Sequence, residues 1–481
     1  MRATPHSLEA RELAAEALLN EEARDALWLA RGEGPGEGPR VNGAGFARDA
    51  AAIAVFDAHR ATLLGEAALV YATRRARAAY DAARGAVSLT LRPQRPAVRF
   101  DVVASVSLGD ANRARREALL KGAEAELGGL RRAARVAVEA LREGLAALEA
   151  PVVARVGFGA FDPAPTLDAT DDLLHELDAA VLRAEGVDPL RLTLGDRLRS
   201  LAAPAVARGF PSAIWAEEAA RWGLGLGLGG AVGGVRSGLL RSRAEAEGVG
   251  FWGLEAGRSA VVAGRPGVAG WYAAEVLGAM SAALSMNLSG GPSPGHRRGL
   301  DRAAPWAFHA LGRRLVFDRV WLTRALGVEG ATRERMMLEA LHAEVLRVRR
   351  DAALAAYAHA VMSREAELAT RFVEAIERAW RVRLDPAWAV VIAGRALDRS
   401  SFWGDRWAAR ARGAAVESLL FGAMRDRFDD DWWRNPSAGD GLRGHVGALY
   451  ALGPEAWSEG LSGLSMAARY REVMAAITRA K

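Results

Sequence analysis

Apolar residues recur at steps of three and four along most of this 481-residue chain, with arginine or glutamate between them. Residues 48–84 and 110–150 show the pattern most clearly. This spacing is typical of an amphipathic helix, which buries one face and exposes the other. Because such helices must bury their apolar faces against one another, we expect a mostly α fold with a minor β component.

Two short regions depart from the helical period. Residues 87–91 and 98–102 alternate with a period of two, which predicts a hairpin or two extended segments. The apolar run Ala260-Val-Val-Ala263 predicts a further strand, and a helix is expected over residues 271–287. Both regions are short, so they add only a small β element to the helical fold.

Glycine-rich stretches predict breaks in the chain. Residues 32–45 are rich in glycine and proline and predict a linker. A second break is expected over residues 223–238, where Gly225, Gly227 and Gly230 match a dinucleotide-loop spacing. This match follows an expected helix rather than a strand, so a flexible connection fits better than a nucleotide site.

The composition excludes several classes of protein. The chain has no cysteine, which rules out disulfide scaffolds and thiol chemistry and fits a reducing compartment. Its 64 basic residues face 58 acidic ones, and the net charge of +6 is too small to predict nucleic-acid binding. No signal-peptide core and no apolar run of about 18 residues is present. We therefore expect a soluble, cytoplasmic protein that binds neither nucleic acid nor membrane.

The C-terminal third carries a resemblance to a known family. The run Asp431-Trp-Trp-Arg-Asn-Pro436, with residues 371–382 and 398–407 before it, resembles the closing helices of the oligoendopeptidase F and thimet oligopeptidase family of zinc peptidases. Weaker similarity reaches back to about residue 110. The resemblance implies an N-terminal helical region with a short β segment over 1–110 and an oligoendopeptidase-like domain over 111–481. It also implies a helical bowl with a deep central groove.

The same resemblance points to a lost zinc site. In the register we favour, the first histidine of the family's HExGH helix corresponds to Val276, the general-base glutamate to Leu277 and the second histidine to Met280. The third ligand falls near Pro305 or Trp306. Zinc needs nitrogen, oxygen or thiolate donors, and none of these side chains offers one. We therefore expect no catalytic residues, no metal and no remaining zinc cofactor.

The resemblance also suggests which residues line the groove. Trp403, Arg406 and Trp407 are the candidates, and Trp407 stands where the family has a phenol that stabilises the oxyanion. The leading hypothesis is a catalytically inactive pseudopeptidase that binds a peptide or protein partner or serves as a scaffold.

Two alternatives remain open. An active metallopeptidase could use an unorthodox metal site near His309, Glu339 and His342, and residues 309–313 also resemble a broken HExGH motif in a competing register. Alternatively, the protein is purely structural, with Met280, Trp306 and Trp407 filling the groove. In each case Trp432 and Trp433 are expected to be structural anchors.

Overall fold

The structure is a computed structural model. It describes residues 5–31, 45–54, 57–86, 88–89, 98–99, 112–125, 127–159, 161–201, 203, 205–206, 212–237, 249–255, 257–264, 271–362, 368–384, 407–453 and 463–479. Within these ranges helices predominate and strands are few and short, so the expected mostly α fold is confirmed. The predicted linker at 32–45 lies outside the described residues except for Gly45.

In the first half of the chain, the described elements are helices and helical turns apart from one small hairpin. Its elements are α1 (Pro5–Arg31), α2 (Phe46–Ile53), α3 (Ala58–Ala86), β1 (Ser88–Leu89), β2 (Val98–Arg99), α5 (Arg113–Ala125), α6 (Leu127–Ala146), α7 (Ala150–Val153), the π-helical turn η1 (Ala154–Phe158), α8 (Ala164–Ala169), α9 (Asp171–Leu182), the 3₁₀ turn η2 (Arg183–Glu185), α10 (Leu194–Leu201) and α12 (Ser212–Gly225). Strands β1 and β2 pair antiparallel, with Ser88 opposite Arg99, which confirms the predicted hairpin.

The second half contains the second sheet and the longest helix. Its elements are α13 (Gly229–Gly233), β3 (Val235–Ser237), β4 (Val249–Glu255), β5 (Ser259–Gly264), α14 (Trp271–Leu288), α15 (Pro294–Arg298), α16 (Ala303–Arg314), η3 (Leu315–Phe317), α17 (Arg319–Leu326), α18 (Gly330–Met362), α19 (Leu368–Trp380), α21 (Trp407–Phe428), η4 (Trp432–Arg434), α22 (Pro436–Leu452) and α23 (Gly463–Arg479). The predicted strand at 260–263 and the predicted helix at 271–287 are both confirmed.

The second sheet has the strand order β3-β5-β4. Strand β3 runs parallel to β5, and β4 runs antiparallel to it. Helices α14 and α1 both pack on β4 and β5, and Ala260, Val261 and Val262 of the central strand are fully buried. A strand covered in this way has a continuous apolar run rather than an alternating one, as the sequence does here.

The glycine-rich run at 223–238 is more ordered than expected. Part of it forms α13 and β3, and the side chain of Asn287 donates to the carbonyl of Ala231 at 2.8 Å. A Cβ atom at Gly234 would lie 2.8 Å from that same Asn287 amide, so glycine is needed for the close packing. Helix α12 does end within this run, at Gly225, as the expected break requires, and glycine at 234 lets the short elements that follow pack closely.

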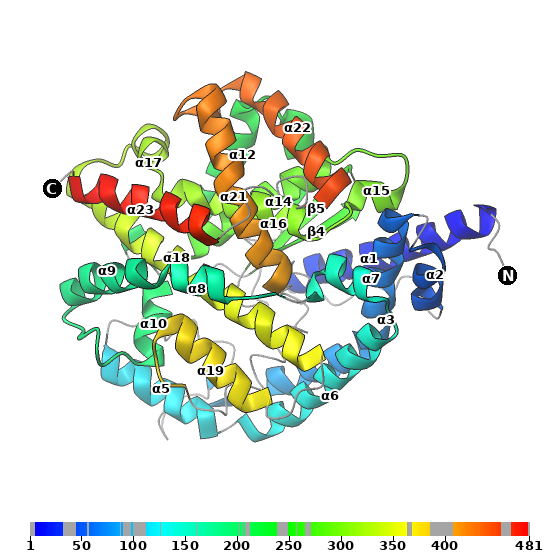
Figure 1. Ribbon diagram of the computed structural model, residues 1–481, viewed down its shortest axis with the longest axis horizontal. Helices are drawn as coiled ribbons and strands as arrows, with labels where there is room; N and C mark the ends of the chain where they lie inside the picture. The colour runs from blue at the N-terminus through cyan, green and yellow to red at the C-terminus, as the bar shows by residue number, and fades with distance from the viewer. Residues whose placement is uncertain are drawn as a thin grey trace.

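Helix α18 runs across the middle of the molecule, as Figure 1 shows, with α5, α6 and α19 below it and α12, α21 and α22 above it. Helix α3 packs on α6 and on α15, across the predicted boundary at residue 110. That boundary stays a prediction. No helix among the described residues is both long enough and apolar enough to cross a membrane.

The paired tryptophans after α21 are buried as structural anchors should be. Trp432 is fully buried and Trp433 is 7% exposed. The ring of Trp432 meets Trp222 edge to face at 6.2 Å and Phe421 at 6.4 Å. These contacts fix η4 between α12 and α21, which supports the predicted role.

Candidate functional site

Helices α14, α16 and α21 approach one another closely because glycine stands at their contacts. A Cβ atom at Gly278 of α14 would lie 2.8 Å from the carbonyl oxygen of His309 on α16. At Gly413 of α21 it would lie 2.6 Å from Cβ of Trp306, also on α16. Such distances are below normal van der Waals contact, so these positions tolerate no larger side chain without a backbone shift. The close approach brings charged groups of neighbouring helices together.

Glu275 of α14 lies at the centre of this interface and is 7% exposed. Its Oε1 is 3.2 Å from Nε of Arg347 and 4.0 Å from Nη1 of Arg313, and its Oε2 is 3.4 Å from Nε2 of His309. Burial alone would raise the pKa of Glu275. Interaction with His309 and the positive charges of Arg347 and Arg313 outweighs burial and holds that pKa well below its usual value. Glu275 is therefore ionised inside the protein.

A second carboxylate shares the same two arginines. Nη2 of Arg313 donates to Oε1 of Glu344 at 2.7 Å, and Nη1 of Arg347 donates to Oε2 of Glu344 at 2.8 Å. With Glu275, these residues form what we call the charge square, with two carboxylates and two guanidinium groups in alternation. All four are buried. Its net charge is zero, so the square avoids the high cost of an unpaired buried charge.

His309 lies beside the charge square and is 1% exposed. Its Nδ1 is 3.1 Å from Nη1 of Arg313, and because a guanidinium group can only donate, Nδ1 must accept. The proton of the neutral ring is therefore on Nε2, which points to Glu275. Burial, together with the charges of Arg313 and Arg410, lowers the pKa of His309 to about 4, although interaction with Glu275 opposes this shift.

Aromatic rings cover the other side of His309. The ring of Trp306 lies 4.7 Å away and that of Phe251, from β4, lies 5.4 Å away. Arg410 of α21 stacks on Trp306 at 4.7 Å and pairs with Asp351 of α18 at 2.9 Å. The neutral imidazole thus lies between an aromatic layer and a charged layer, a setting that favours its uncharged form.

The positions that resemble the zinc ligands are part of this core. Val276 and Leu277 are fully buried, and Met280 and Trp306 are each 5% exposed. Trp407, expected to line a groove, is also 5% exposed, whereas Trp403 and Arg406 lie outside the described residues. The deep central groove itself stays a prediction.

The three residues proposed for the alternative metal site do not lie close enough together to share an ion. His342 pairs with Asp178 at 2.8 Å, Glu339 accepts from the backbone nitrogen of Ala205 at 2.5 Å, and His309 points to the charge square. Among the described residues, the group of three potential ligands close enough to share an ion is instead Asp57, His59 and His296. Hence His309, Glu339 and His342 serve three separate contacts.

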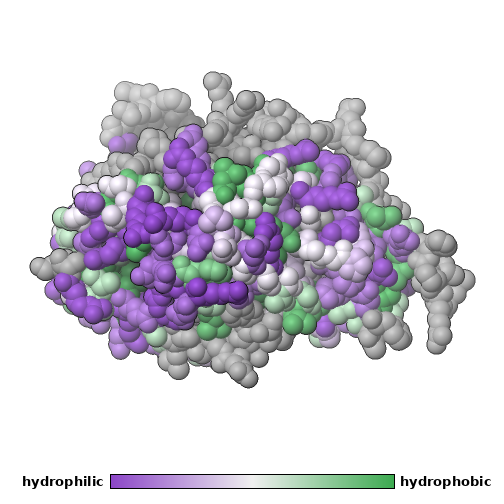
Figure 2. Space-filling model, turned by 90° about the horizontal axis from the view of Figure 1, so that it is seen from above, coloured by the Kyte–Doolittle hydropathy of each residue, from purple (hydrophilic) through white to green (hydrophobic). Residues whose placement is uncertain are grey.

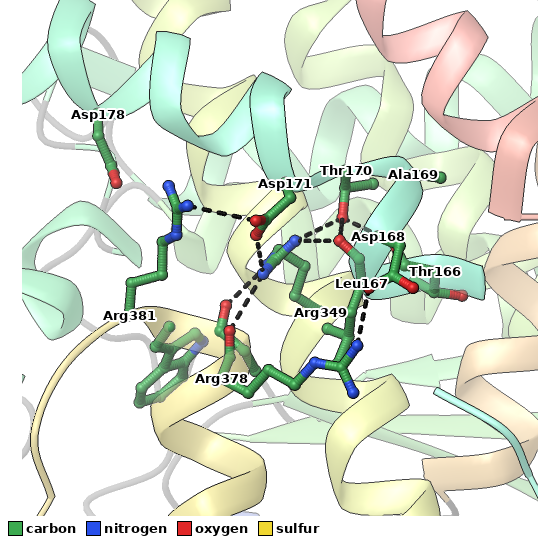
Figure 3. A network of polar contacts seen from close by, with 12 residues as sticks. Thr166, Leu167, Asp168, Ala169, Thr170, Asp171, Asp178, Arg349, Arg378 and Arg381 are labelled. Carbon is green, nitrogen blue, oxygen red and sulfur yellow. Dashed lines mark hydrogen bonds and ion pairs between the residues drawn. The ribbon is translucent and has the colours of Figure 1, made fainter. Parts of the chain in front are cut away.

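Arg349 of α18 joins three helices in a network drawn in Figure 3. Its Nε donates to the carbonyl of Ala379 at 2.8 Å, and its Nη1 donates to the carbonyl of Leu167 at 2.6 Å and to the hydroxyl of Thr170 at 2.9 Å. Its Nη2 donates to Asp171 at 2.8 Å and to a carbonyl at the end of α19 at 3.1 Å. All five donors of the guanidinium group are thus used, and two of them cap the carbonyls that end α19.

A second buried arginine, Arg197, also binds a carbonyl at the end of α19 together with a carboxylate. Nε of Arg197 donates to the carbonyl of Trp380 at 2.5 Å, and its two Nη atoms bind both oxygens of Asp178. Burial would raise the pKa of Asp178, but hydrogen bonds from His342 and Arg197 lower it to about 2. Asp178 is therefore the shared partner of α10 and α18.

The sequence contains a weak signal for these polar groups. Glu275 is the one charged residue of α14, and it stands immediately before Val276, the position that the resemblance singled out. Glu344 and Arg347 stand at a spacing of three on α18, which places them on one helix face. What the sequence could not show is that both belong to a buried face rather than a solvated one.

Figure 2 shows one face with hydrophilic residues interspersed with small hydrophobic patches. The large apolar side chains exposed among the described residues come from separate segments: Leu13, Tyr71, Val136, Leu190, Leu224 and Leu452. Scattered exposure of this kind is normal and assigns no binding surface.

A scan against protein-family models gave no match for this sequence, and a search of curated proteins gave none either.

Proposed function

We propose that this protein is a catalytically inactive member of the oligoendopeptidase F and thimet oligopeptidase family, which acts as a scaffold or as a binder of a peptide or protein partner. The observation that carries the proposal is the state of the positions that resemble the zinc site. Val276, Leu277 and Met280 are apolar and packed in the core, so they offer neither donors for a metal nor a base for a water molecule.

The polar groups next to these positions form ion pairs and hydrogen bonds with one another. Glu275 is balanced by Arg313 and Arg347, and Nδ1 of His309 is used by Arg313. A general base must reach the proton it removes, whereas His309 is 1% exposed. A buried and charge-balanced arrangement supports a role in holding the helices together rather than a role in hydrolysis.

The scaffold form of the proposal is favoured over binding in an inherited groove. Met280, Trp306 and Trp407 are all nearly fully buried, which is what filling of the former site requires. A partner would then bind elsewhere on the surface. The proposal also takes the protein to be cytoplasmic and to bind neither nucleic acid nor membrane.

The test compares activity with stability in one variant. His309→Gln keeps a polar side chain of similar length, and His175→Gln, on the exposed face of α9, is its control. Wild-type protein and both variants are incubated with zinc and a mixture of quenched fluorescent oligopeptides. We expect no hydrolysis by any of the three proteins, together with a lower unfolding free energy for His309→Gln alone.

Hydrolysis by the wild type that is lost in His309→Gln and retained in His175→Gln would overturn the proposal. Binding of the same peptides, measured without cleavage by fluorescence anisotropy, separates a peptide binder from a scaffold. A scaffold leaves the anisotropy unchanged, and a binder raises it in a saturable way.

A further inference from the structure

Two histidines and an aspartate from distant parts of the chain meet at the start of α3. Asp57 immediately precedes α3, His59 lies in its first turn, and His296 lies in α15. One ligand atom from each side chain lies within 4.8 Å of the other two. The imidazole rings of the two histidines stack at 4.4 Å with an angle of 14° between their planes. Eight histidines are present in the whole chain, so this pair across more than two hundred residues is a specific feature.

Ring nitrogens of the two histidines can supply two ligands at this cluster. Nε2 of His59 is buried and has no hydrogen-bond partner. Nδ1 of His296 is 2.9 Å from the hydroxyl of Ser293, so Nε2 is the nitrogen of this ring that would bind an ion. Metal-binding histidines usually have such a partner on the second nitrogen. A buried ring nitrogen without a partner is costly, and a metal ion would remove that cost.

Asp57 can supply the third ligand without losing its structural role. Its Oδ1 accepts from the backbone nitrogen of Arg60 at 3.1 Å, which caps the start of α3. Its Oδ2 is 3.4 Å from Nε of Arg60, but that nitrogen is closer to Glu12, at 3.0 Å. Oδ2 can therefore turn to an ion while Arg60 keeps its pair with Glu12.

The backbone around the cluster is firmly held. Glu12, which is 1% exposed, also accepts from the backbone nitrogen of Gly295 at 2.8 Å and so ties α1 to α15. A Cβ atom at Gly295 would lie 3.0 Å from the carbonyl carbon of His59, so α15 packs directly on the first turn of α3. The stacked rings direct their lone pairs nearly parallel, so at least one imidazole must rotate to bind a shared ion. Two ligands bonded at about 2.1 Å around a tetrahedral ion are about 3.4 Å apart.

We propose that Asp57, His59 and His296 bind one divalent transition-metal ion of the zinc or cobalt class, with water completing its coordination. Nitrogen and carboxylate donors in this number suit zinc and cobalt better than magnesium or calcium, which prefer oxygen alone. The three ligands are half-buried, so the ion could exchange with solvent. The bound ion would cross-link α3 to α15 and stabilise the folded protein. This site lies apart from the positions that resemble the family's zinc ligands, and it requires no catalysis.

Full-length protein, freed of metal with a chelator, is titrated with cobalt chloride and followed by visible absorption and calorimetry. We expect one equivalent to bind with the d–d bands of a cobalt ion ligated by nitrogen and oxygen. His59→Ala and His296→Ala should each weaken binding at least tenfold. Asp57→Asn keeps the helix cap but removes the carboxylate, so weaker binding with unchanged circular dichroism would assign Asp57 as a ligand.

Two controls make the outcome decisive. His175→Ala removes an exposed histidine of α9, and His309→Gln removes the histidine beside the charge square. Both should bind cobalt as the wild type does. Binding of less than about a tenth of an equivalent by the wild type, or equal binding by His59→Ala, would overturn the proposal. Loss of binding in His309→Gln alone would place the metal in the core, and it would overturn this proposal and contradict the proposed function as well.

Discussion

Replacement of Arg349 by methionine tests whether buried arginines hold this helical fold together. The side chain of Arg349 is 1% exposed, and methionine approximates its length without any donor. The substitution leaves the buried carbonyls of Ala379 and Leu167 without their donors. Each such buried group costs about 1–3 kcal/mol, so two of them give about 4 kcal/mol. Loss of the ion pair with Asp171 adds no more than about 1 kcal/mol, because the Asp171 side chain is 45% exposed and water can solvate it.

A matched control exists in the same network. Arg381 contacts Asp171 at 3.2 Å, as does Arg349 at 2.8 Å, but the side chain of Arg381 is 40% exposed (Figure 3). Arg381→Met should therefore lower the unfolding free energy by no more than about 0.5 kcal/mol. Arg349→Lys should fall between the two, because an ammonium group cannot reproduce the planar fork of donors.

The assay is urea unfolding followed by circular dichroism, with tryptophan fluorescence as a second probe to test for a two-state transition. Hydrogen exchange adds a local measurement, since loss of the caps should speed exchange in the last turn of α19. Equal stabilities for Arg349→Met and Arg381→Met would refute the reasoning, because the burial and the full set of donors would then contribute nothing.

Two further predictions concern the core around the charge square. The pKa of His309 is about 4 in the folded protein and 6.5 when unfolded, so its neutral form is favoured by folding. Its contribution of about 3 kcal/mol is present above pH 6.5 and is lost as the pH falls from 6.5 to 4, at 1.36 kcal/mol per unit. Unfolding free energies measured at pH 7 and pH 4 should differ less in His309→Gln than in the wild type, and identical differences would contradict this account. Gly278→Ala should lower stability by about 2 kcal/mol, because its Cβ would lie 2.8 Å from a backbone oxygen, whereas Gly447→Ala in α22, with nothing within 4 Å, should raise it by about 0.5–1 kcal/mol. Thermal unfolding measures whether the melting temperature falls in Gly278→Ala and rises in Gly447→Ala. Equal shifts in melting temperature would show that α14 and α16 are less tightly packed.

The sequence predicted helices and strands better than it predicted which side chains contact one another. The period of three and four residues predicted α14 and α3, and the apolar run at 260–263 predicted β5, because these patterns depend on local geometry. The sequence did not predict that Glu275 faces His309, since this contact depends on how two helices pack. Nor did it predict that Arg349 is buried, because a charged residue on a helix is usually solvated. Burial of such groups depends on partners that are distant in the chain.

The candidate site shows the same limit. The resemblance pointed to Val276 in α14. The residue of α14 that contacts Arg347 and His309 is Glu275, one position before it. A single residue on a helix turns the side chain by about 100°, so the choice of position decides which helix it faces. Pattern alone could not fix that choice.

The central claim is that the charge square holds the fold rather than performs chemistry, and a double-mutant cycle tests it most directly. Unfolding free energies are measured for Glu275→Gln, Arg347→Met and the double variant. We predict that each single substitution costs about 3–5 kcal/mol and that the double costs at least about 2 kcal/mol less than their sum, because removing both partners leaves no unpaired charge. Single substitutions that leave stability unchanged would contradict the claim and would mark these residues as kept for a function other than folding.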